Sequence, residues 1–323
     1  MSELFKERLN YLGKNREPFL FLIDFELLKP MVWKATEIPS NIHFSLPILK
    51  ENSIDSKQPV LDRLDLDFKA LDQKIVERRI KEVQKRQNNG ESYLLNLSFK
   101  VPILPSFQDL ESLYSVSLAA YKFLWVEKFV CFSPECFIQI KENKLSTFPI
   151  KGTIDKTIPN AEVVLRSNKK EIEEHNTVVD LLRNDLNGVS TNVQVDKFRV
   201  LTEITNSKGG LLQTHSEISG ILPKNWEEKI GSIIMSLLPA GSISGAPKRK
   251  TVSIIREVEQ IRRNYYTGIF GYFDGKSLDS GILIRFIEKD KDKFYFRTGC
   301  GITINSIIED EYNELHKKIY VPF

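Results

Sequence analysis

Short apolar runs alternate with amphipathic segments along most of the chain. Residues 19–24 form an apolar run that ends in an aspartate, which is typical of a short buried strand. Residues 67–87 carry apolar side chains at steps of three to four, which predicts a helix that ends at Asn88-Asn89-Gly90. Strands are expected over residues 93–99, 129–150, 192–204, 211–218 and 269–273. This alternation indicates a mixed fold, but it does not separate α+β from α/β.

The segment 129–150 has the pattern of a hairpin, with its apolar runs separated by Ser133-Pro134-Glu135 and by Glu142-Asn143. Glu135 therefore stands where one run ends and the next begins. A carboxyl group followed by apolar residues can be partly buried, which raises its pKa and suits it to act as a general acid. The alternative is an ordinary glutamate in a surface turn.

The same segment leads into Pro149-Ile150-Lys151-Gly152-Thr153. Gly152 lets the backbone bend directly after the lysine, and Pro149 suits an edge or first position of a strand. A lysine held in this way can point into a cavity. Desolvation or a neighbouring cation would then lower its pKa and make it a nucleophile or a base. A solvated surface lysine is the alternative.

A helix is predicted over residues 167–186, with Ser167 as its cap. Glu171 and Glu174 lie three residues apart and so share a face of this helix. Two acids near a helix start also interact favourably with the helix dipole. On their own, therefore, they do not indicate a metal site.

A last helix is predicted over residues 309–320, and it carries Glu311, Glu314 and Lys318. At about 100° per residue these side chains fall within a sector of about 60°. Carboxylate oxygens grouped in this way suit magnesium better than zinc. The alternative is a surface ion pair between Glu314 and Lys318.

Three further segments place polar groups beside strand or helix ends. The small residues of 239–248 precede a helix predicted over 248–261, and free N–H groups at such a start can bind an anion. Arg285 is the last residue of a strand predicted over 281–285. A buried arginine needs a partner there, which is either a ligand carboxylate or an acidic side chain in a structural salt bridge. Gly299-Cys300-Gly301 lacks the context of a nucleophile, and we interpret its glycines as backbone donors close to a ligand.

Composition narrows the class of protein. The chain has 323 residues, is 41% apolar and carries a formal charge of +3, which favours a globular protein and gives no indication of a nucleic-acid or membrane partner. Its three cysteines follow no spacing pattern, which indicates reduced thiols in a cytoplasmic protein. The sequence contains no run of about 18 apolar residues, so it predicts no membrane-spanning helix.

Taken together, motifs from Phe129 to the end of the chain resemble those of the chorismate-utilising enzymes, which include anthranilate, aminodeoxychorismate, isochorismate and salicylate synthases. No single motif is specific for this family, but the occurrence of all of them in the family's order is specific. The motifs are Ser133-Pro134-Glu135, Pro149-Ile150-Lys151-Gly152-Thr153, Glu174-x5-Asp180-Leu181-x-Arg183-Asn184-Asp185, Gly241-Ser242-Ile243-Ser244-Gly245-Ala246-Pro247-Lys248, Arg262-Arg263 with Tyr266, Ile284-Arg285, Gly299-x-Gly301 and Glu311-x2-Glu314-x3-Lys318.

The resemblance implies an α+β fold, with two facing antiparallel sheets, outer helices and the active site in the cleft between the sheets. We expect a short segment, residues 1–65, to pack on a catalytic domain of residues 66–323. The resemblance also implies a role for each matched residue. Lys151 would add to C2 of chorismate, and Glu135 would protonate the leaving C4 hydroxyl.

Further roles concern the metal and the substrate. Magnesium would be held by Glu174 and Glu314, with Glu311 and Glu171 nearby, and the metal would hold the ring carboxylate. The remaining matched residues would contact the substrate; they are Ser242, Tyr266, Arg285, Gly299, Gly301 and Lys318.

The lysine separates branches of the family. Anthranilate synthases typically have alanine at the position of Lys151, whereas the aminodeoxychorismate branch has Pro-Ile-Lys-Gly-Thr, as here. The sequence therefore most resembles the aminodeoxychorismate branch, which takes ammonia from a separate glutamine amidotransferase subunit. Isochorismate and salicylate synthases, in which this lysine acts as a base, remain the alternative, followed by anthranilate synthase. One departure is Gln213, which stands where many relatives have a catalytic histidine, while His215 lies two residues later.

Overall fold

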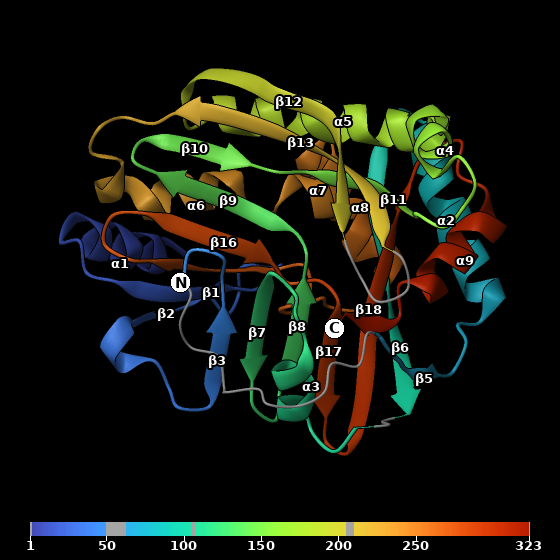
Figure 1. Cartoon of the computed structure of the whole chain (residues 1–323), viewed down its shortest axis with the longest axis horizontal. Helices are drawn as coiled ribbons and strands as arrows, with labels where there is room; N and C mark the ends of the chain where they lie inside the picture. Colours follow the sequence, from blue (N-terminus) through green and yellow to red (C-terminus); the bar gives the residue numbers. More distant parts are fainter. Residues whose placement is uncertain (1, 50–62, 105–106, 205–209, 323) are drawn as a thin grey trace.

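The computed structural model describes residues 2–49, 63–104, 107–204 and 210–322. Two antiparallel sheets face each other, and helices pack against them from outside (Figure 1). The predicted α+β architecture is therefore confirmed. In the described part of the chain, no helix has both the length and the apolar character needed to cross a membrane.

The first sheet has the strand order β11-β13-β10-β9-β16-β15-β1-β2, and β12 pairs with β13 outside this path. All its neighbouring strands are antiparallel. Its strands are β1 (Phe19–Ile23), β2 (Met31–Lys34), β9 (Cys136–Lys141), β10 (Lys144–Thr147), β11 (Ile150–Asp155), β12 (Thr191–Ile204), β13 (Leu211–Ile221), β15 (Ile269–Phe273) and β16 (Leu278–Ile282).

The second sheet has the order β14-β6-β18-β17-β8-β7-β3, and β5 pairs with β6. Its strands are β3 (Ile42–Ser45), β5 (Asp67–Phe68), β6 (Leu94–Leu104), β7 (Tyr121–Trp125), β8 (Phe129–Ser133), β14 (Gly245–Ala246), β17 (Phe286–Asp290) and β18 (Lys293–Ile302). A separate pair joins β4 (Arg63–Asp65) to β19 (Tyr320–Pro322).

Helix α5 packs on β12 and β13, and α9 packs on β18, whereas α1 packs on another helix, α6. Their bounds are α1 (Ser2–Lys14), α2 (Gln73–Asn88), α3 (Leu110–Val116), α4 (Ala161–Ser167), α5 (Lys169–Asn187), α6 (Ile230–Leu237), α7 (Gly241–Ser244), α8 (Lys248–Glu259) and α9 (Ile308–Lys317), with 3-10 turns η1 (Ala35–Glu37) and η2 (Trp226–Lys229).

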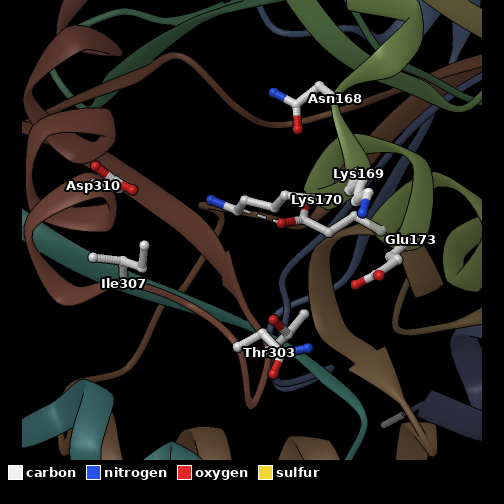
Figure 2. A pocket seen from close by; sticks show the side chains of 9 residues that line it. Asn168, Lys169, Lys170, Glu173, Thr303, Ile307 and Asp310 are labelled. Carbon is white, nitrogen blue, oxygen red and sulfur yellow. Dashed lines mark ion pairs between the residues drawn. The ribbon is translucent and has the colours of Figure 1, made fainter.

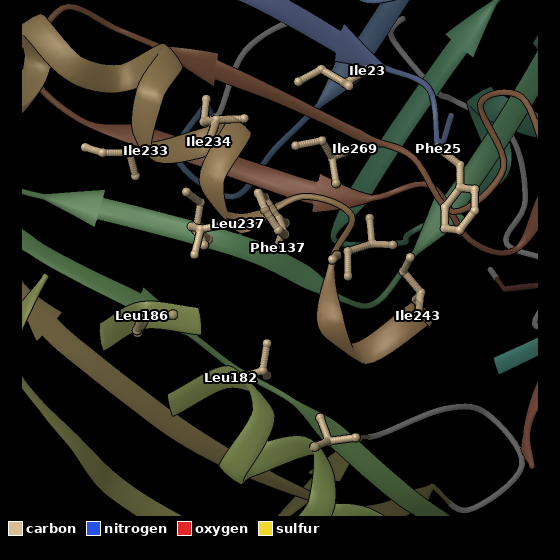
Figure 3. Close-up of a cluster of buried hydrophobic side chains, with 14 of the residues drawn as sticks. Ile23, Phe25, Phe137, Leu182, Leu186, Ile233, Ile234, Leu237, Ile243 and Ile269 are labelled. Atoms are coloured by element: carbon tan, nitrogen blue, oxygen red, sulfur yellow. The ribbon is translucent and has the colours of Figure 1, made fainter. Parts of the chain in front are cut away.

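β1 explains why the first apolar run lacks polar alternation. The strand lies between β15 and β2. Phe19, Phe21 and Ile23 join a cluster with helix side chains, and Figure 3 shows Ile23 near Ile233 and Ile234 of α6. Leu20 and Leu22 join a cluster with side chains of the second sheet. Because successive side chains of a strand point to opposite faces, a strand covered on both sides is apolar throughout.

The predicted boundary between a short N-terminal segment and the catalytic domain, between residues 65 and 66, stays a prediction. Residues 50–62 lie outside the described residues.

The predicted hairpin over 129–150 is wrong in its first half. β8 belongs to the second sheet and β9 to the first, so Ser133-Pro134-Glu135 crosses between the sheets. The chain crosses back after β16, and the two crossings are hydrogen-bonded to each other. The Ile282 N–H donates to the Glu135 carbonyl at 3.1 Å, and the Phe132 N–H donates to the Arg285 carbonyl at 3.2 Å. Glu135 and Arg285 are thereby brought to the junction of the two sheets.

Arg285 itself lies beyond the strand predicted for it. β16 ends at Ile282, and Arg285 has a φ of 53° in the connection to β17. A positive φ is uncommon for a residue with a side chain, and it is often found at sites where the surrounding structure fixes the backbone.

Helix starts were predicted less accurately than helix faces. Ser167 ends α4, where its hydroxyl donates to the Val163 carbonyl, and the N-cap of α5 is Asn168. The predicted helix over 67–87 begins only at Gln73, after Asp72 accepts bonds from two backbone N–H groups. The segment before it pairs as β5 with β6, which the helical spacing had concealed.

Candidate active site

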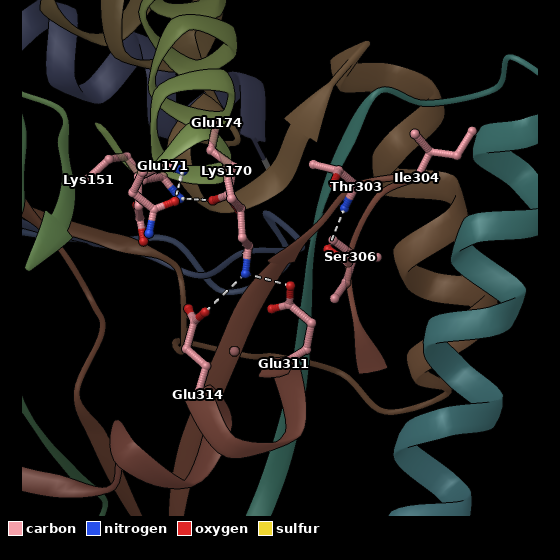
Figure 4. Close-up of polar contacts among 12 residues, drawn as sticks. Lys151, Lys170, Glu171, Glu174, Thr303, Ile304, Ser306, Glu311 and Glu314 are labelled. Atoms are coloured by element: carbon pink, nitrogen blue, oxygen red, sulfur yellow. Dashed lines mark hydrogen bonds and ion pairs between the residues drawn. The ribbon is translucent and has the colours of Figure 1, made fainter. Parts of the chain in front are cut away.

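A carboxylate cluster forms where α5 and α9 meet beside β11 and β18 (Figure 4). Glu171 and Glu174 come from α5, and Glu311 and Glu314 come from α9. We call these side chains the carboxylate cluster. Glu174 is 6% exposed and Glu311 is fully buried, whereas Glu171 and Glu314 are partly exposed, so the cluster reaches from the interior to the surface. The structure thus brings together the four glutamates that the sequence analysis assigns to a metal site, and that assignment stays a prediction.

Lys151 reaches the cluster from β11. Gly152 has a φ of 74°, and the register of β11 against β13 shifts between Lys151 and Thr153. Such a bulge re-aims a side chain. The Thr214 hydroxyl donates to the Lys151 carbonyl and fixes the backbone there. Lys151 Nζ consequently lies 3.1 Å from Glu174 Oε2, with the lysine side chain only 21% exposed.

Lys170 lies inside the cluster and was not predicted as a site residue. Its Nζ is 2.6 Å from Glu311 Oε1, 3.5 Å from Glu314 Oε2 and 3.9 Å from Glu174 Oε1. One signal in the sequence could have found it. Lys170 stands four residues before Glu174 and therefore shares its face of the helix.

The charges of the cluster shift the pKa of its members. Burial lowers the pKa of Lys151, but Glu174, Glu171 and Glu314 outweigh burial and raise the pKa above its ordinary value. The lowered pKa expected of a desolvated lysine is therefore not found, because the carboxylates stabilise the ammonium form. Burial raises the pKa of Glu314, but Lys318, Lys170 and Lys151 lower it to about 2.

The donors of the carboxylate cluster fit magnesium, which prefers oxygen ligands. Glu311 Oε2 is buried and has no hydrogen-bond partner among the residues that the structure describes. An unpartnered buried carboxylate oxygen is costly, and a cation would satisfy it. As arranged, however, the described residues include no group of three or more histidine, cysteine or acidic side chains that could hold a metal ion. Ammonium groups of Lys151, Lys170 and Lys318 lie between the carboxylates instead.

Glu135 lies close to this cluster. The Ser242 hydroxyl and the Lys151 ammonium group lie near enough to its carboxyl group to lower its pKa. Burial nevertheless dominates and raises the pKa of Glu135 above its ordinary value. The partly buried acid predicted from the sequence is therefore found, and Ser242 is its neighbour as well as a candidate substrate contact.

The remaining predicted substrate contacts lie around the end of β18. Lys318 Nζ donates to the Gly299 carbonyl at 2.9 Å and lies 2.6 Å from Glu314 Oε1. A side chain at Gly299 would meet the Tyr266 hydroxyl at 3.1 Å, and one at Gly301 would meet Glu174 Oε2 at 3.1 Å. The two glycines therefore leave room for close approach to the cluster.

Arg285 faces the same region from the sheet junction. Its guanidinium donates to the Lys318 carbonyl and to the Tyr320 hydroxyl, each at 3.4 Å. Both bonds are long. The planar fork of the guanidinium is suited to bind a carboxylate with two hydrogen bonds.

Two histidines lie on elements next to β11, and neither is predicted as a catalytic residue: His215 is on β13, opposite Ile150, and His175 is on α5. His215 Nδ1 pairs with the Thr202 hydroxyl at 2.9 Å, and Gln213 is paired in register with Thr153. His175 is fully buried, with Nε2 at 2.6 Å from the Ser216 hydroxyl. Burial lowers the pKa of His175 to about 4, so its ring is neutral at physiological pH.

Comparisons of sequence extend the resemblance over almost the whole chain. The family model for chorismate binding enzymes matches residues 35–322. An uncharacterized PabA-like protein of Haemophilus influenzae is 47% identical over 319 residues, which cover 98% of this chain and 96% of that protein. Aminodeoxychorismate synthase component 1 of Bacillus subtilis is 32% identical over 247 residues, which cover 72% of this chain and 51% of that protein. Anthranilate synthase components match at similar identity.

A solved structure supports the same fold. The menaquinone-specific isochorismate synthase of Escherichia coli superposes with a TM-score of 0.71 at 15% identity, covering 98% of this chain and 80% of that one. At this identity the likeness concerns the fold, and the match of residues 35–322 to the family model establishes the family. The chain belongs to the chorismate binding enzymes.

Proposed function

We propose that the chain is component 1 of an aminodeoxychorismate synthase, which converts chorismate and ammonia to 4-amino-4-deoxychorismate for para-aminobenzoate and folate biosynthesis. The observation that carries the proposal is Lys151, whose Nζ lies 3.1 Å from Glu174 Oε2 at the carboxylate cluster. Anthranilate synthases typically have alanine at this position. A lysine here offers an amine that can bond to the substrate ring.

The reaction balances in two displacements. Lys151 Nζ bonds to C2 of chorismate, the ring double bond shifts, and the C4 hydroxyl leaves as water with a proton from Glu135. Ammonia then bonds to C4, the double bond shifts back, and the bond between Lys151 and C2 breaks with its electron pair returning to Nζ. A proton from the new C4 ammonium group restores the acid form of Glu135. Lysine thus acts as a nucleophile that divides one displacement into two easier ones.

The substrate carboxylates have cationic and N–H partners in the chain. Arg285 and Lys318 supply positive charge near the N–H groups of Gly299 and Gly301, and Tyr266 supplies a hydroxyl. Magnesium held by Glu174 and Glu314 would fix the ring carboxylate and offset the negative charge that keeps Lys151 protonated.

The ammonia would come from a glutamine amidotransferase partner. The sequence predicts no Cys-His-Glu set for a glutaminase, and the aminodeoxychorismate branch of the family takes ammonia from a separate subunit. A heterodimer, held tightly or transiently, is therefore part of the proposal, and free ammonium is the alternative donor.

Product analysis tests the proposal. The pure chain is incubated with chorismate and magnesium at mildly alkaline pH, with and without isotopically labelled ammonium, and products are identified by mass. Labelled aminodeoxychorismate that forms only with ammonium is the expected result. Isochorismate or salicylate formed without ammonium would contradict the proposal. The chain would then be an isochorismate or salicylate synthase, with Lys151 as a base that activates water. If nothing turns over, the assay is repeated with an amidotransferase and glutamine, and continued inactivity would contradict the proposal.

Replacing Glu135 by glutamine is expected to lower kcat by about 10²–10⁴-fold, because an amide keeps the shape but donates no acidic proton. Burial raises the pKa of Glu135, and only its protonated form can protonate the leaving hydroxyl. The wild-type rate should therefore fall as pH rises through this raised pKa, and the Glu135→Gln rate should lack that fall. A pH–rate profile makes the measurement, with Glu142→Gln, an exposed turn residue, as control. A fall that persists in Glu135→Gln would assign the proton to another group.

A further inference from the structure

Lys170 occupies the point where the ligand oxygens converge. Its Nζ lies within 4 Å of one oxygen each from Glu174, Glu311 and Glu314, and so it joins α5 to α9 (Figure 4). Among the described residues, the other two lysines at the cluster each pair with a single carboxylate: Lys151 with Glu174, and Lys318 with Glu314. Lys170 is therefore the cation whose position overlaps most with that of a shared metal ion.

We propose that Lys170 is a built-in substitute for the divalent cation, and that magnesium must displace its ammonium group in order to bind. This inference rests on the proposed magnesium site. Magnesium binds oxygens at about 2.0–2.1 Å and requires near-octahedral geometry. An ion that used Glu174 and Glu314 together would therefore lie among the same oxygens that now face Lys170 Nζ. A metal ion and the Lys170 ammonium group cannot both occupy the point between these oxygens, because two cations there would repel each other.

The structure offers the displaced side chain somewhere to go. A cavity of about 400 Å³ borders Lys170, and it is also lined by Glu173 and Asp310 (Figure 2). These two acids are exposed, and they lie on the same helices as the carboxylate cluster. Lys170 is 36% exposed, so its side chain can turn toward this cavity without crossing the core. The ammonium would leave one group of carboxylates for another.

The arrangement also accounts for the unpartnered oxygen. Lys170 satisfies Glu311 Oε1 but not the buried Oε2. The lysine therefore neutralises part of the negative charge and holds α9 against α5, while Glu311 Oε2 accepts no hydrogen bond from any described residue. A divalent ion carries twice the charge, which favours the exchange.

Metal binding without substrate tests this inference. Manganese serves as the probe, with free ion measured by electron paramagnetic resonance and magnesium added as competitor. Lys170→Gln should bind manganese about tenfold more tightly than the wild type, since no ammonium has to be displaced. Lys170→Arg keeps the charge and should stay near the wild type. Lys169→Gln removes an exposed lysine that borders the same cavity and is the matched control.

Thermal unfolding provides the second readout. Without metal, Lys170→Gln should unfold at a lower temperature than the wild type, and saturating magnesium should close that gap. A purely structural lysine would leave the gap unchanged by metal. Metal binding by Lys170→Gln that equals or falls below that of the wild type would overturn the inference. The magnesium site itself would still stand if Glu314→Gln, which removes a ligand, lost metal binding. If no form of the chain binds metal, both the inference and the magnesium site fail, while product analysis still judges the reaction separately.

Discussion

Replacing Lys151 by alanine is expected to reduce ammonium-dependent turnover of chorismate by at least about 10³-fold. The reason is geometric as well as chemical. Lys151 lies on a bulged strand that directs its Nζ to the carboxylate cluster, and no other group is proposed to form the bond to C2. Turnover is measured from chorismate consumption and from product mass.

The matched control for Lys151→Ala is Lys156→Ala. Lys156 follows the same strand by one residue, but its ammonium forms an exposed ion pair with Glu203. Exposed pairs contribute about 0–1 kcal/mol, so this variant should keep wild-type turnover. Lys151→Ala with near wild-type turnover would remove the lysine from the chemistry, provided its unfolding temperature matches that of the control.

The largest effect on stability is expected at Arg263, a motif residue with a structural role. Its side chain is fully buried and forms two bonds to Glu259, at 3.0 Å from Nε to Oε2 and 2.6 Å from Nη2 to Oε1. It also donates to the carbonyls of Ile243 and Asn96, and so joins α7 to β6. Arg263→Ala should lower the free energy of unfolding by about 3–5 kcal/mol, because Glu259 would be left buried without its partner.

Denaturant unfolding measures this effect, and Arg262→Ala is the control. Arg262 is the exposed neighbour of Arg263, and a surface substitution should change the free energy of unfolding by no more than about 0.5 kcal/mol. A similar loss for both variants would mean that the buried pair does not stabilise the fold more than an exposed arginine does.

Periodicity predicted single elements well and connections poorly. The run at 19–23 could be identified as a buried strand because both of its faces are covered, which leaves no polar position. By contrast, the sequence pattern of β8 and β9 predicts a hairpin, because two apolar runs around a turn have the same pattern whether or not the two strands pair with each other. Only the partners of each strand show that Ser133-Pro134-Glu135 passes between the sheets.

The site shows the same limit. Glu311 and Glu314 could be grouped from helical spacing, since both lie on one helix. That Lys151 meets Glu174 depends on the bulge at Gly152 and on the packing of α5 beside β11, neither of which periodicity reveals. Lys170 was missed because a lysine near a helix start is usually solvated. Its role follows only from the approach of α9.

The central claim is that Lys151 bonds to the substrate ring, and intact-protein mass measurement tests it most directly. The chain is mixed with chorismate and magnesium without ammonium, quenched rapidly and analysed by peptide mapping. The predicted result is a mass increase equal to chorismate less one water, located on Lys151 and removed by added ammonium. Formation of aminodeoxychorismate with no such adduct at any quench time, or an adduct that persists in Lys151→Ala, would contradict the account.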